Sequence, residues 1–291
     1  MMNRTMAHVI EQIKSENFPT LLREIAHPPK ELYVQGTPPS EDAKVLAVVG
    51  SRKCTSYGRD VTDFLISGLR GYNISIVSGL ALGIDGQAHK AALEACLHTV
   101  AVPGSGLSEK VLYPRAHVPL ARHILESGGC LLSEYAPEQE AAPWTFPKRN
   151  RIMAGMAHAV LMIEATERSG TLITASLATE YNRELLVIPG SIFANSSKGT
   201  HQFLKLGATP VTTPVDILEA LHMSTAQVEA AEISLSLSAV EQEVYDLLHE
   251  PLTKDELLEK LSCSATEANI LLSKLELDGV IVERYGALRQ A

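Results

Sequence analysis

Aromatic residues are scarce in this sequence of 291 residues, at 5% of the chain, and its few cysteines are widely spaced. The four cysteines lie far apart without a CxxC motif, so neither a disulfide framework nor a zinc site is indicated; they are Cys54, Cys96, Cys130 and Cys263. No apolar stretch approaches the ~20 residues that a membrane helix needs, and no signal-peptide pattern is found. We therefore expect a cytoplasmic protein without a membrane anchor, a metal centre or a cofactor.

Positive charge is also in short supply, since 25 Lys and Arg stand against 34 Asp and Glu, for a formal net charge of −9. Most of the excess lies at the C-terminal end, where residues 238–291 hold 5 Lys and Arg against 11 Asp and Glu, or −6. The rest of the chain is nearly balanced, so a local basic groove can exist within it. Net charge therefore leaves nucleic acid open as a partner.

Six apolar runs rich in β-branched residues recur along the chain, each followed by a Gly or Ser turn and a helical pattern. They cover residues 45–50, 74–79, 99–104, 130–134, 159–165 and 185–190. Runs that are continuously apolar predict strands buried on both faces. Because strands alternate with helices, we expect an α/β fold with a doubly wound, mostly parallel sheet.

Four segments are expected along the chain. Residues 1–43 hold two short helical patterns and several prolines, which predicts a short N-terminal helical extension that packs on the main domain. Residues 44–223 hold the predicted sheet domain, and residues 224–237 form a Ser/Ala/Glu-rich linker. Residues 238–291 are expected to form a small second domain.

The second domain shows a helix-turn-helix pattern. Thr253 and Glu256 have the spacing of a capping box at a helix start, an apolar helical pattern runs from Thr266 to Leu277, and residues 280–282 favour a strand. Tight duplex binding is not expected, because phosphate neutralisation is the main source of affinity and this tail is acidic. A protein contact or a weak accessory role fits the tail better.

In an open parallel sheet, ligands bind beyond the carboxyl ends of the strands, and three predicted strands end there in small or polar residues. Ser51 and Arg52 follow the first strand, and Gly79 opens a glycine-rich turn after the second. Ser169 and Thr171 lead into a helix after the fifth. Amides, hydroxyls and a guanidinium at these positions can face a phosphate, although each turn is also compatible with an ordinary strand-to-helix connection.

Two other features near these turns are open to more than one interpretation. Asp85 and His89 are four residues apart at a predicted helix start, and a structural role is favoured because no further residue completes a metal or nucleophile set. The glycine turn at residues 103–106 can be a tight loop or an anion-binding nest.

The most informative segment is residues 144–151, where three cations and two aromatic residues crowd into eight positions. Aromatic faces beside cations favour single-stranded nucleic acid, because bases stack on the rings while the cations follow the phosphates. The candidates for these contacts are Phe146, Lys148, Arg149 and Asn150. The alternative is that Trp144 and Phe146 belong to the core, whereas Lys148 and Arg151 belong to an exposed helix start.

Taken together, these motifs resemble the DNA-processing protein A family (DprA, also called Smf). The similarity runs from about residue 17 to residue 221. The motifs that carry it are Phe18-Pro19, Gly50-Ser51-Arg52, Ser78-Gly79-Leu80-Ala81, Gly83-Ile84-Asp85, Tyr113-Pro114, Phe146-Pro147, Arg149-Asn150-Arg151, Ser169-Gly170-Thr171 and Ile188-Pro189-Gly190. The tail resembles the small winged-helix domain that some members carry.

The resemblance implies an extended Rossmann-like domain that binds single-stranded DNA, protects incoming DNA, forms a homodimer and helps to load the RecA recombinase in natural transformation. It implies no enzymatic activity. Carried over position by position, it assigns the DNA contacts to Ser51, Arg52, Phe146, Lys148, Arg149, Asn150, Ser169 and Thr171, with Gly79 permitting close approach. For the homodimer, the apolar candidates are Phe203, Leu204 and Leu206.

Two other functions are compatible with such a fold. Nucleoside-monophosphate phosphoribohydrolases resemble it and carry a Pro-Gly-Gly-x-Gly-Thr loop with a catalytic Glu, whereas the nearest stretch here, residues 103–108, lacks the second Gly and the Thr. A transcription regulator would need a basic recognition helix, and residues 266–278 offer one Lys against three acidic residues. Both functions therefore rank below single-stranded DNA binding.

Overall fold

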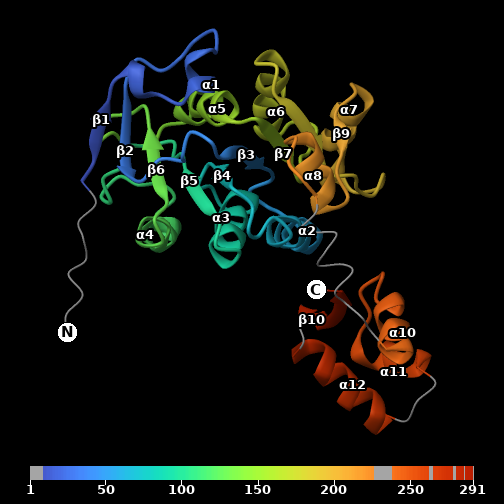
Figure 1. Ribbon diagram of the computed structural model, residues 1–291. Helices are drawn as coiled ribbons and strands as arrows, with labels where there is room; N and C mark the ends of the chain where they lie inside the picture. Colours follow the sequence, from blue (N-terminus) through green and yellow to red (C-terminus); the bar gives the residue numbers. More distant parts are fainter. Residues whose placement is uncertain (1–8, 226–237, 262–264, 278–279, 285, 291) are drawn as a thin grey trace, which may run out of the picture. The chain divides into compact units, whose positions relative to one another are not determined.

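The chain forms two compact units in the computed structural model, Met1–Thr225 and Ala226–Ala291 (Figure 1). The residues that the structure describes are 9–225, 238–261, 265–277, 280–284 and 286–290. Most of the predicted linker, and Cys263, lie outside these residues. Within them, no helix is both long and apolar enough to cross a bilayer.

A nine-stranded sheet runs through the first unit in the order β1-β2-β6-β5-β4-β3-β7-β8-β9. All neighbouring pairs from β6 to β9 are parallel, whereas β1–β2 and β2–β6 are antiparallel. The strands are β1 (Glu11–Ile13), β2 (Leu32–Gly36), β3 (Lys44–Val49), β4 (Ile74–Ser78), β5 (His98–Ala101), β6 (Cys130–Ser133), β7 (Ala159–Met162), β8 (Glu184–Val187) and β9 (Thr209–Pro210).

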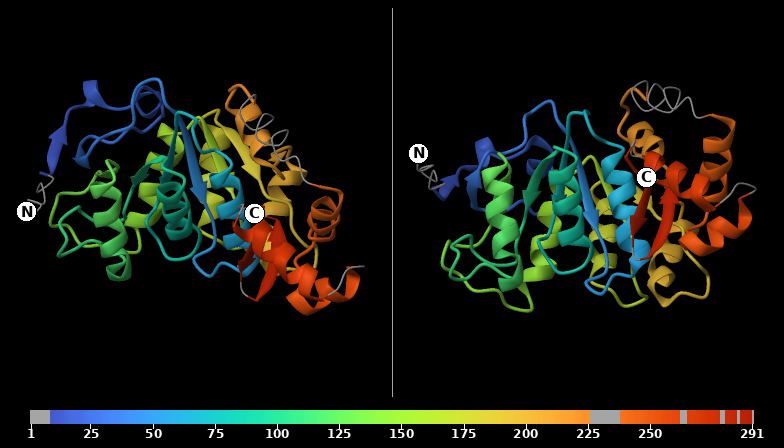
Figure 2. Two further views of the ribbon diagram at one scale, coloured as in Figure 1. Left: turned by 60° about the horizontal axis from the view of Figure 1, so that its bottom comes forward. Right: turned by 90° about the horizontal axis from the view of Figure 1, so that it is seen from below.

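Helices cover both faces of this sheet, as the continuous apolar runs predicted (Figures 1 and 2). On one face lie α2 (Ser56–Ser67), α3 (Ile84–Glu94) and α4 (Val118–Glu126), and on the other lie α1 (Thr20–Arg23), α5 (Thr145–Met156) and α6 (Thr171–Glu180). Two further helices complete the unit, with α7 (Lys198–Lys205) packed against β8 and α8 (Pro214–Ala220) against α2. The doubly wound α/β prediction is therefore confirmed, and each of the six predicted runs overlaps one of the strands β3 to β8.

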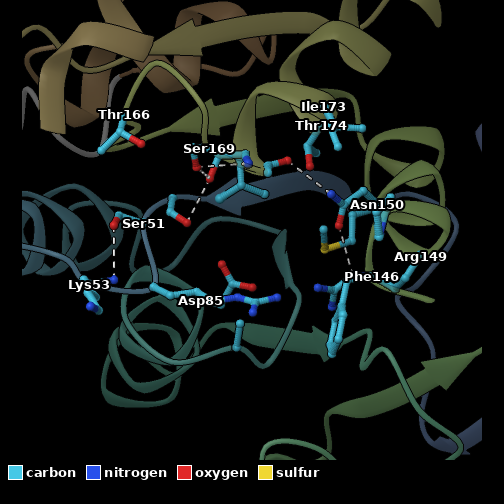
Figure 3. Close-up of a pocket in the computed structure, with 18 of the residues that line it drawn as sticks. Ser51, Lys53, Asp85, Phe146, Arg149, Asn150, Thr166, Ser169, Ile173 and Thr174 are labelled. Carbon is cyan, nitrogen blue, oxygen red and sulfur yellow. Dashed lines mark hydrogen bonds between the residues drawn. The ribbon is translucent and has the colours of Figure 1, made fainter. Parts of the chain in front are cut away.

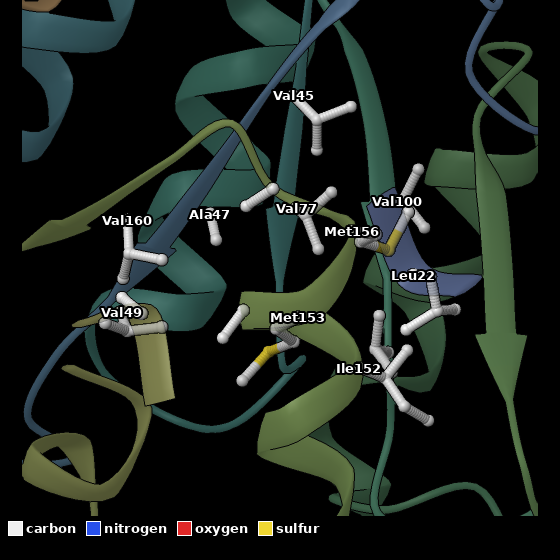
Figure 4. Close-up of a cluster of buried hydrophobic side chains, with 14 of the residues drawn as sticks. Leu22, Val45, Ala47, Val49, Val77, Val100, Ile152, Met153, Met156 and Val160 are labelled. Carbon is white, nitrogen blue, oxygen red and sulfur yellow. The ribbon is translucent and has the colours of Figure 1, made fainter. Parts of the chain in front are cut away.

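The main core lies between the sheet and the α5 layer (Figure 4). Alternate residues of β3, namely Val45, Ala47 and Val49, face the same side, because side chains alternate along a strand. They belong to one buried cluster with Met153 and Met156 of α5, and all five are less than a tenth exposed. This packing fixes α5 on the sheet.

The region before β3, expected to be a short N-terminal helical extension, contains both helix and strand in its described residues. Among residues 9–43, α1 and a short 3-10 helix at Ser15–Asn17 are the helical elements that the structure describes, while β1 and β2 extend the sheet at one edge. Leu32 and Val34 are buried and alternate with less buried neighbours, so β2 presents one face to the core. Such a short alternation, paired with the distant β6, gives little local signal in the sequence.

Of the three apolar residues predicted as homodimer contacts, one belongs to the core. Phe203 is 8% exposed and lies in the main cluster, and Leu204 is partly buried against it. Leu206, by contrast, is 79% exposed at the end of α7. Phe203 therefore lies on the inward face of the amphipathic helix α7. Of the three predicted dimer contacts, Leu206 is the one that is accessible to a partner.

The described residues of the second unit form helices followed by a hairpin, which is the winged-helix arrangement that the sequence predicted. β10 and β11 pair in antiparallel fashion, and Leu252 bridges to Leu288. The capping box predicted at Thr253 and Glu256 is present at the start of α11. The elements are α10 (Ala239–Leu247), α11 (Lys254–Lys260), α12 (Ala265–Leu277), β10 (Ile281–Arg284) and β11 (Ala287–Gln290).

Candidate functional site

The strand order creates a topological switch between β3 and β7. From β3 the chain proceeds outward through β4 and β5 to β6, and from β7 it proceeds the other way to β8 and β9. Loops that leave the two neighbouring strands therefore diverge beyond Val49 and Met162, which are paired in register. A cavity of about 780 Å³ lies at this point (Figure 3).

Seven of the nine predicted site residues line this cavity, and they come from the loops after β3 and β7 and from the first turns of α5 and α6. The seven are Ser51, Arg52, Phe146, Arg149, Asn150, Ser169 and Thr171. The structure thus brings together residues that are more than a hundred positions apart in the sequence. Gly79 and Lys148 are not among the lining residues.

The loop after β3 presents two exposed cations, Arg52 and Lys53, at the cavity. Ser51 Oγ accepts a hydrogen bond from the Lys53 amide at 3.1 Å, which tightens the turn. Farther along, the Thr55 amide and hydroxyl both donate to the Glu164 carboxylate, at 2.9 and 2.6 Å. Because Glu164 is 2% exposed at the end of β7, it anchors the end of this loop to the sheet.

The ring of Phe146 is half-buried in the wall of the cavity rather than part of the core. The Arg52 guanidinium carbon lies 4.9 Å from its centroid, and the ring of Tyr113 lies 5.6 Å away at a tilt of 58°. Gly104 gives the ring room, since a Cβ there would come within 2.6 Å of it. A cation and an aromatic face are therefore held together at the cavity.

Arg149, one of the predicted DNA contacts, lines the cavity but is largely engaged by the protein's own backbone. It is 4% exposed, and its guanidinium donates to the carbonyls of Gly79, at 2.6 Å, and Val102. Burial lowers its pKa to about 10, an effect that Asp85 opposes and Arg52 reinforces. A Cβ on Gly79 would lie 2.3 Å from Arg149 Nη1, so the absence of a side chain at Gly79 gives this guanidinium room.

Hydrogen bonds join the two sides of the switch point. The Thr171 hydroxyl donates to the carbonyl of Gly50 at 3.0 Å, which links the loop after β7 to the loop after β3. Ser169 Oγ accepts from the Thr171 amide at 3.2 Å, and Asn150 Oδ1 accepts from Arg149 Nε at 3.2 Å. Thr171 and Asn150 are buried while Ser169 is half-buried, so Ser169 offers the more accessible polar group.

Lys148 lies on the other side of α5, away from the cavity. Its Nζ is 3.3 Å from the Glu134 carboxylate and 5.9 Å from the centroid of the Trp144 ring. Trp144 is 58% exposed, so the alternative that placed it in the core is wrong. The basic-aromatic segment is thus divided by its own helix into two faces.

Asp85 and His89, four residues apart on α3, lie in different surroundings. Asp85 lines the cavity, where burial raises the pKa of its carboxyl and Arg149 lowers it. His89 is fully buried and its Nδ1 lies 2.8 Å from the Thr99 hydroxyl. Across the described parts of both units, no group of three or more His, Cys, Asp or Glu could hold a metal ion.

Apart from Asp85, four polar residues at the cavity were not among the predicted site residues: Lys53, Thr166, Thr174 and Ser196. Lys53 directly follows Arg52, so the run of cations was a usable signal. Thr166 lies in the loop after β7 that carries Ser169. Ser196 comes from the loop after β8, where no motif marks it, and only the fold brings it to the site.

Comparison with protein-family models gives two matches. Residues 9–222 match the model of DNA recombination-mediator protein A, and residues 228–287 match the model of the DprA winged helix domain. The chain is also similar to Protein Smf of Escherichia coli (strain K12), with 41% identity over 74% of this chain and 57% of that protein. DNA processing protein DprA of Bacillus subtilis (strain 168) is 37% identical over 74% of this chain and 72% of its own.

Solved structures similar to this chain include two of DNA processing protein A. DNA processing protein A of Streptococcus pneumoniae is 39% identical with a TM-score of 0.67, covering 72% of this chain and 74% of that one. DNA processing protein A of Helicobacter pylori, described for its single-stranded DNA binding mode, is 27% identical with a TM-score of 0.66, covering 74% and 97%. The chain spans less than two thirds of the Escherichia coli relative. On the family match, this chain belongs to the DNA recombination-mediator protein A (DprA) family.

Proposed function

We propose that the first unit binds single-stranded DNA in the cavity at the β3–β7 switch point and supports recombination by binding rather than by chemistry. The observation that carries this proposal is the joint placement of Arg52, Lys53 and the Phe146 ring on one cavity. Cations can follow phosphates while the ring receives a base. The single-stranded DNA binding mode described for the Helicobacter pylori relative supports the same function.

Accessibility separates the roles of the residues. Arg52 and Lys53 are exposed, so we assign them to the phosphates, and we assign Phe146 to a base. Ser51 and Ser169 are half-buried, and we assign their hydroxyls to the sugar-phosphate backbone of the DNA. The buried members of the predicted set act by holding the cavity in shape, and these are Gly79, Arg149, Asn150 and Thr171.

Single strands are favoured over duplexes for a geometric reason. A base can stack on Phe146 only if it is unpaired and turned out of a helix. The second unit adds little duplex affinity, since its sequence carries −6 and duplex binding depends on neutralising phosphates. For the winged helix we retain a protein contact or a weak accessory role.

We extend the proposal to a homodimer that protects incoming DNA and assists loading of RecA recombinase in natural transformation. Membership of the recombination-mediator family supports this extension. The exposed Leu206 at the end of α7 offers an apolar contact to a second copy. A monomer mass by light scattering at micromolar concentration would contradict the homodimer, and unchanged RecA filament formation on coated single strands would contradict the loading role.

The phosphoribohydrolase alternative finds little support in the glycine turn at residues 103–106. Gly104 abuts the Phe146 ring, and the Ser105 hydroxyl accepts from the Tyr113 amide at 3.2 Å while donating to Gly106. This turn is buried, and the Gly106 amide donates to the Gln139 carbonyl, so it does not form an open phosphate loop. Incubation with nucleoside monophosphates should release no free base, and release would favour the enzyme.

The proposed function is tested by titrating labelled single-stranded and duplex oligonucleotides against the full chain at two salt concentrations. We expect tighter binding to the single strand, with an affinity that falls as salt rises because phosphate contacts release counterions. Equal affinity for both forms, or an affinity independent of salt, would contradict the proposal.

A further inference from the structure

One large aromatic side chain lies exposed beside the cavity without lining it. Trp144 is 58% exposed, and it is the single tryptophan of the sequence. Tryptophan is usually well covered in a folded protein, and it is enriched where one side of the ring is held and the other meets a ligand. Its exposure at the start of α5 therefore calls for a physical reason.

The indole is held in a fixed position by a buried neighbour. The rings of Trp144 and Tyr135 meet edge to face, with centroids 5.9 Å apart and planes at 84°. Tyr135 is 3% exposed, and its hydroxyl donates to the Thr145 carbonyl at 3.0 Å. Because the anchored Tyr135 already restrains the Trp144 ring, stacking of an incoming group on that ring costs little additional side-chain conformational entropy.

A cation stands beside the same ring. Lys148 Nζ lies 5.9 Å from the centroid of Trp144 and 5.7 Å from that of Tyr135, within the range of cation–π attraction. The buried Glu134 carboxylate pairs with Lys148 and with Arg151. Two cations against one carboxylate leave a net positive charge, and the Lys148 side chain is 50% exposed.

This platform consists of Trp144, Tyr135 and Lys148, of which Trp144 and Lys148 lie next to cavity-lining residues along the chain, around the first turn of α5. Pro143 lines the cavity and directly precedes Trp144, so their Cα atoms are about 3.8 Å apart. Phe146, two residues farther on, lines the cavity as well. A DNA strand that leaves the cavity past Pro143 and passes around the first turn of α5 is therefore within reach of the indole.

We propose that the Trp144 platform is a second base-stacking subsite, which receives the single strand where it leaves the cavity. This inference rests on the proposed function, and it divides the basic-aromatic segment between two subsites on opposite sides of the first turn of α5. Phe146 serves the nucleotides inside the cavity, whereas Trp144 takes a base and Lys148 a phosphate outside it. Positive charge beside a flat ring suits an anionic strand of bases better than an apolar protein surface.

The inference requires that the contribution of Trp144 depends on the length of the strand. An oligothymidylate of about 4 nucleotides can occupy the cavity alone, whereas one of about 16 nucleotides reaches the platform. With the full chain, binding is followed by the anisotropy of a label on the DNA and, separately, by the emission of the single tryptophan. We expect the long strand to quench that emission at saturation and the short strand to leave it nearly unchanged.

Variants give an independent measure. Trp144→Ala should weaken binding of the long strand about 5-fold or more, the lower end of the loss of one stacked base, and leave the short strand within about 2-fold. Trp144→Phe should restore most of the affinity because it keeps a ring. Phe64→Ala is the matched control, since Phe64 is 46% exposed on α2 and does not line the cavity, so both strands should bind it normally.

The outcomes separate the two proposals. If both strands bind but emission stays constant and Trp144→Ala binds the long strand normally, the platform proposal is overturned while the cavity stands, and the exposed indole would then fit a protein partner. If neither strand binds the wild-type chain, the proposed function itself fails. If Trp144→Ala has the same thermal unfolding temperature as the wild type, a folding defect is excluded as the cause of weaker binding.

Discussion

The guanidinium carbon of Arg52 lies 4.9 Å from the centroid of the Phe146 ring. This contact joins the loop after β3 to the first turn of α5, and both residues line the cavity. A cation at this distance is attracted to the ring face. The residue assigned to phosphate and the residue assigned to a base therefore hold each other in place.

Single substitutions at this pair should produce different binding signatures. Arg52→Ala should weaken binding of all sequences alike, and the slope of log K against log salt should fall by about 0.7 for each phosphate of the single strand that is no longer neutralised. Phe146→Ala should cost about 1–3 kcal/mol of binding with a smaller change in slope, because it removes stacking. The measurement is anisotropy of labelled oligothymidylate at several salt concentrations.

The double variant tests whether the two residues act together. Because each side chain orients the other, Arg52→Ala and Phe146→Ala combined should cost less than the sum of the single losses, by about 0.5 kcal/mol or more. Additive losses would show that the interaction between the two side chains in the unbound protein has no part in DNA binding. If both single variants fold normally and bind with wild-type affinity, the cavity is the wrong site.

Arg149 should matter to folding before it matters to DNA. Its removal leaves the carbonyls of Gly79 and Val102 without their donor and Asp85 without its nearby positive charge. Arg149→Ala should therefore lower the free energy of unfolding by roughly 3–5 kcal/mol, whereas Arg52→Ala, at an exposed position, should change it little. Thermal unfolding without DNA checks this, and a normal unfolding temperature combined with weaker DNA binding for Arg149→Ala would instead indicate a direct DNA contact.

Gly79 offers a sharper test of the same packing. A Cβ at this position would lie 2.3 Å from Arg149 Nη1, so Gly79→Ala must displace the guanidinium and should cost about 1–3 kcal/mol of stability. Gly170→Ala is the matched control, since a Cβ there would meet nothing within 4 Å. Urea unfolding of the two variants should separate them clearly, and equal stabilities would mean that Arg149 relaxes freely.

The strands of the parallel sheet were predictable because burial on both faces leaves a continuous apolar run in the sequence. β1 and β2 left no such run. Leu32 and Val34 alternate over only one short strand, and their partner β6 lies about a hundred residues away. Pairing at that separation depends on tertiary packing, which local pattern does not report.

The site was predictable as a set of residues but not as an arrangement. Phe146 and Lys148 are two residues apart, and neighbours at that spacing do not face the same side of a helix. Had the start of α5 been known, Trp144, Lys148 and Arg151 would have fallen on one face, with Phe146 and Asn150 on the other. The burial of Arg149 had no sequence signal, because its partners are backbone carbonyls of distant loops.

His89 should make the protein less stable in mild acid. Burial lowers its pKa from an ordinary 6.5 to about 3. Above about pH 6.5 the group is neutral in both states, but below it the unfolded chain binds a proton that the folded chain does not. The free energy of unfolding should therefore fall with decreasing pH, by at most about 1.4 kcal/mol per unit from this group.

The variant His89→Asn isolates this effect from the other histidines. It should be less stable than the wild type near neutral pH, because a buried side chain is replaced, yet lose less stability on going from about pH 7.5 to about pH 5. Urea unfolding at the two pH values gives the difference directly. Parallel losses in the two proteins would show that His89 is protonated in the folded state.

Removal of the acidic tail should leave single-strand binding intact. The cavity and the Trp144 platform both lie within the unit that ends at Thr225, whereas residues 238–291 carry −6 of the total charge of −9. A chain ending at Thr225 should thus bind slightly more tightly than the full chain at about 0.01 M salt, and the gain should shrink at about 0.15 M, where charges are screened within about 8 Å. The comparison uses one oligothymidylate at both salt concentrations. Loss of binding in the shortened chain would move part of the DNA contact to the winged helix, and a salt-independent gain would point to steric rather than electrostatic interference by the tail.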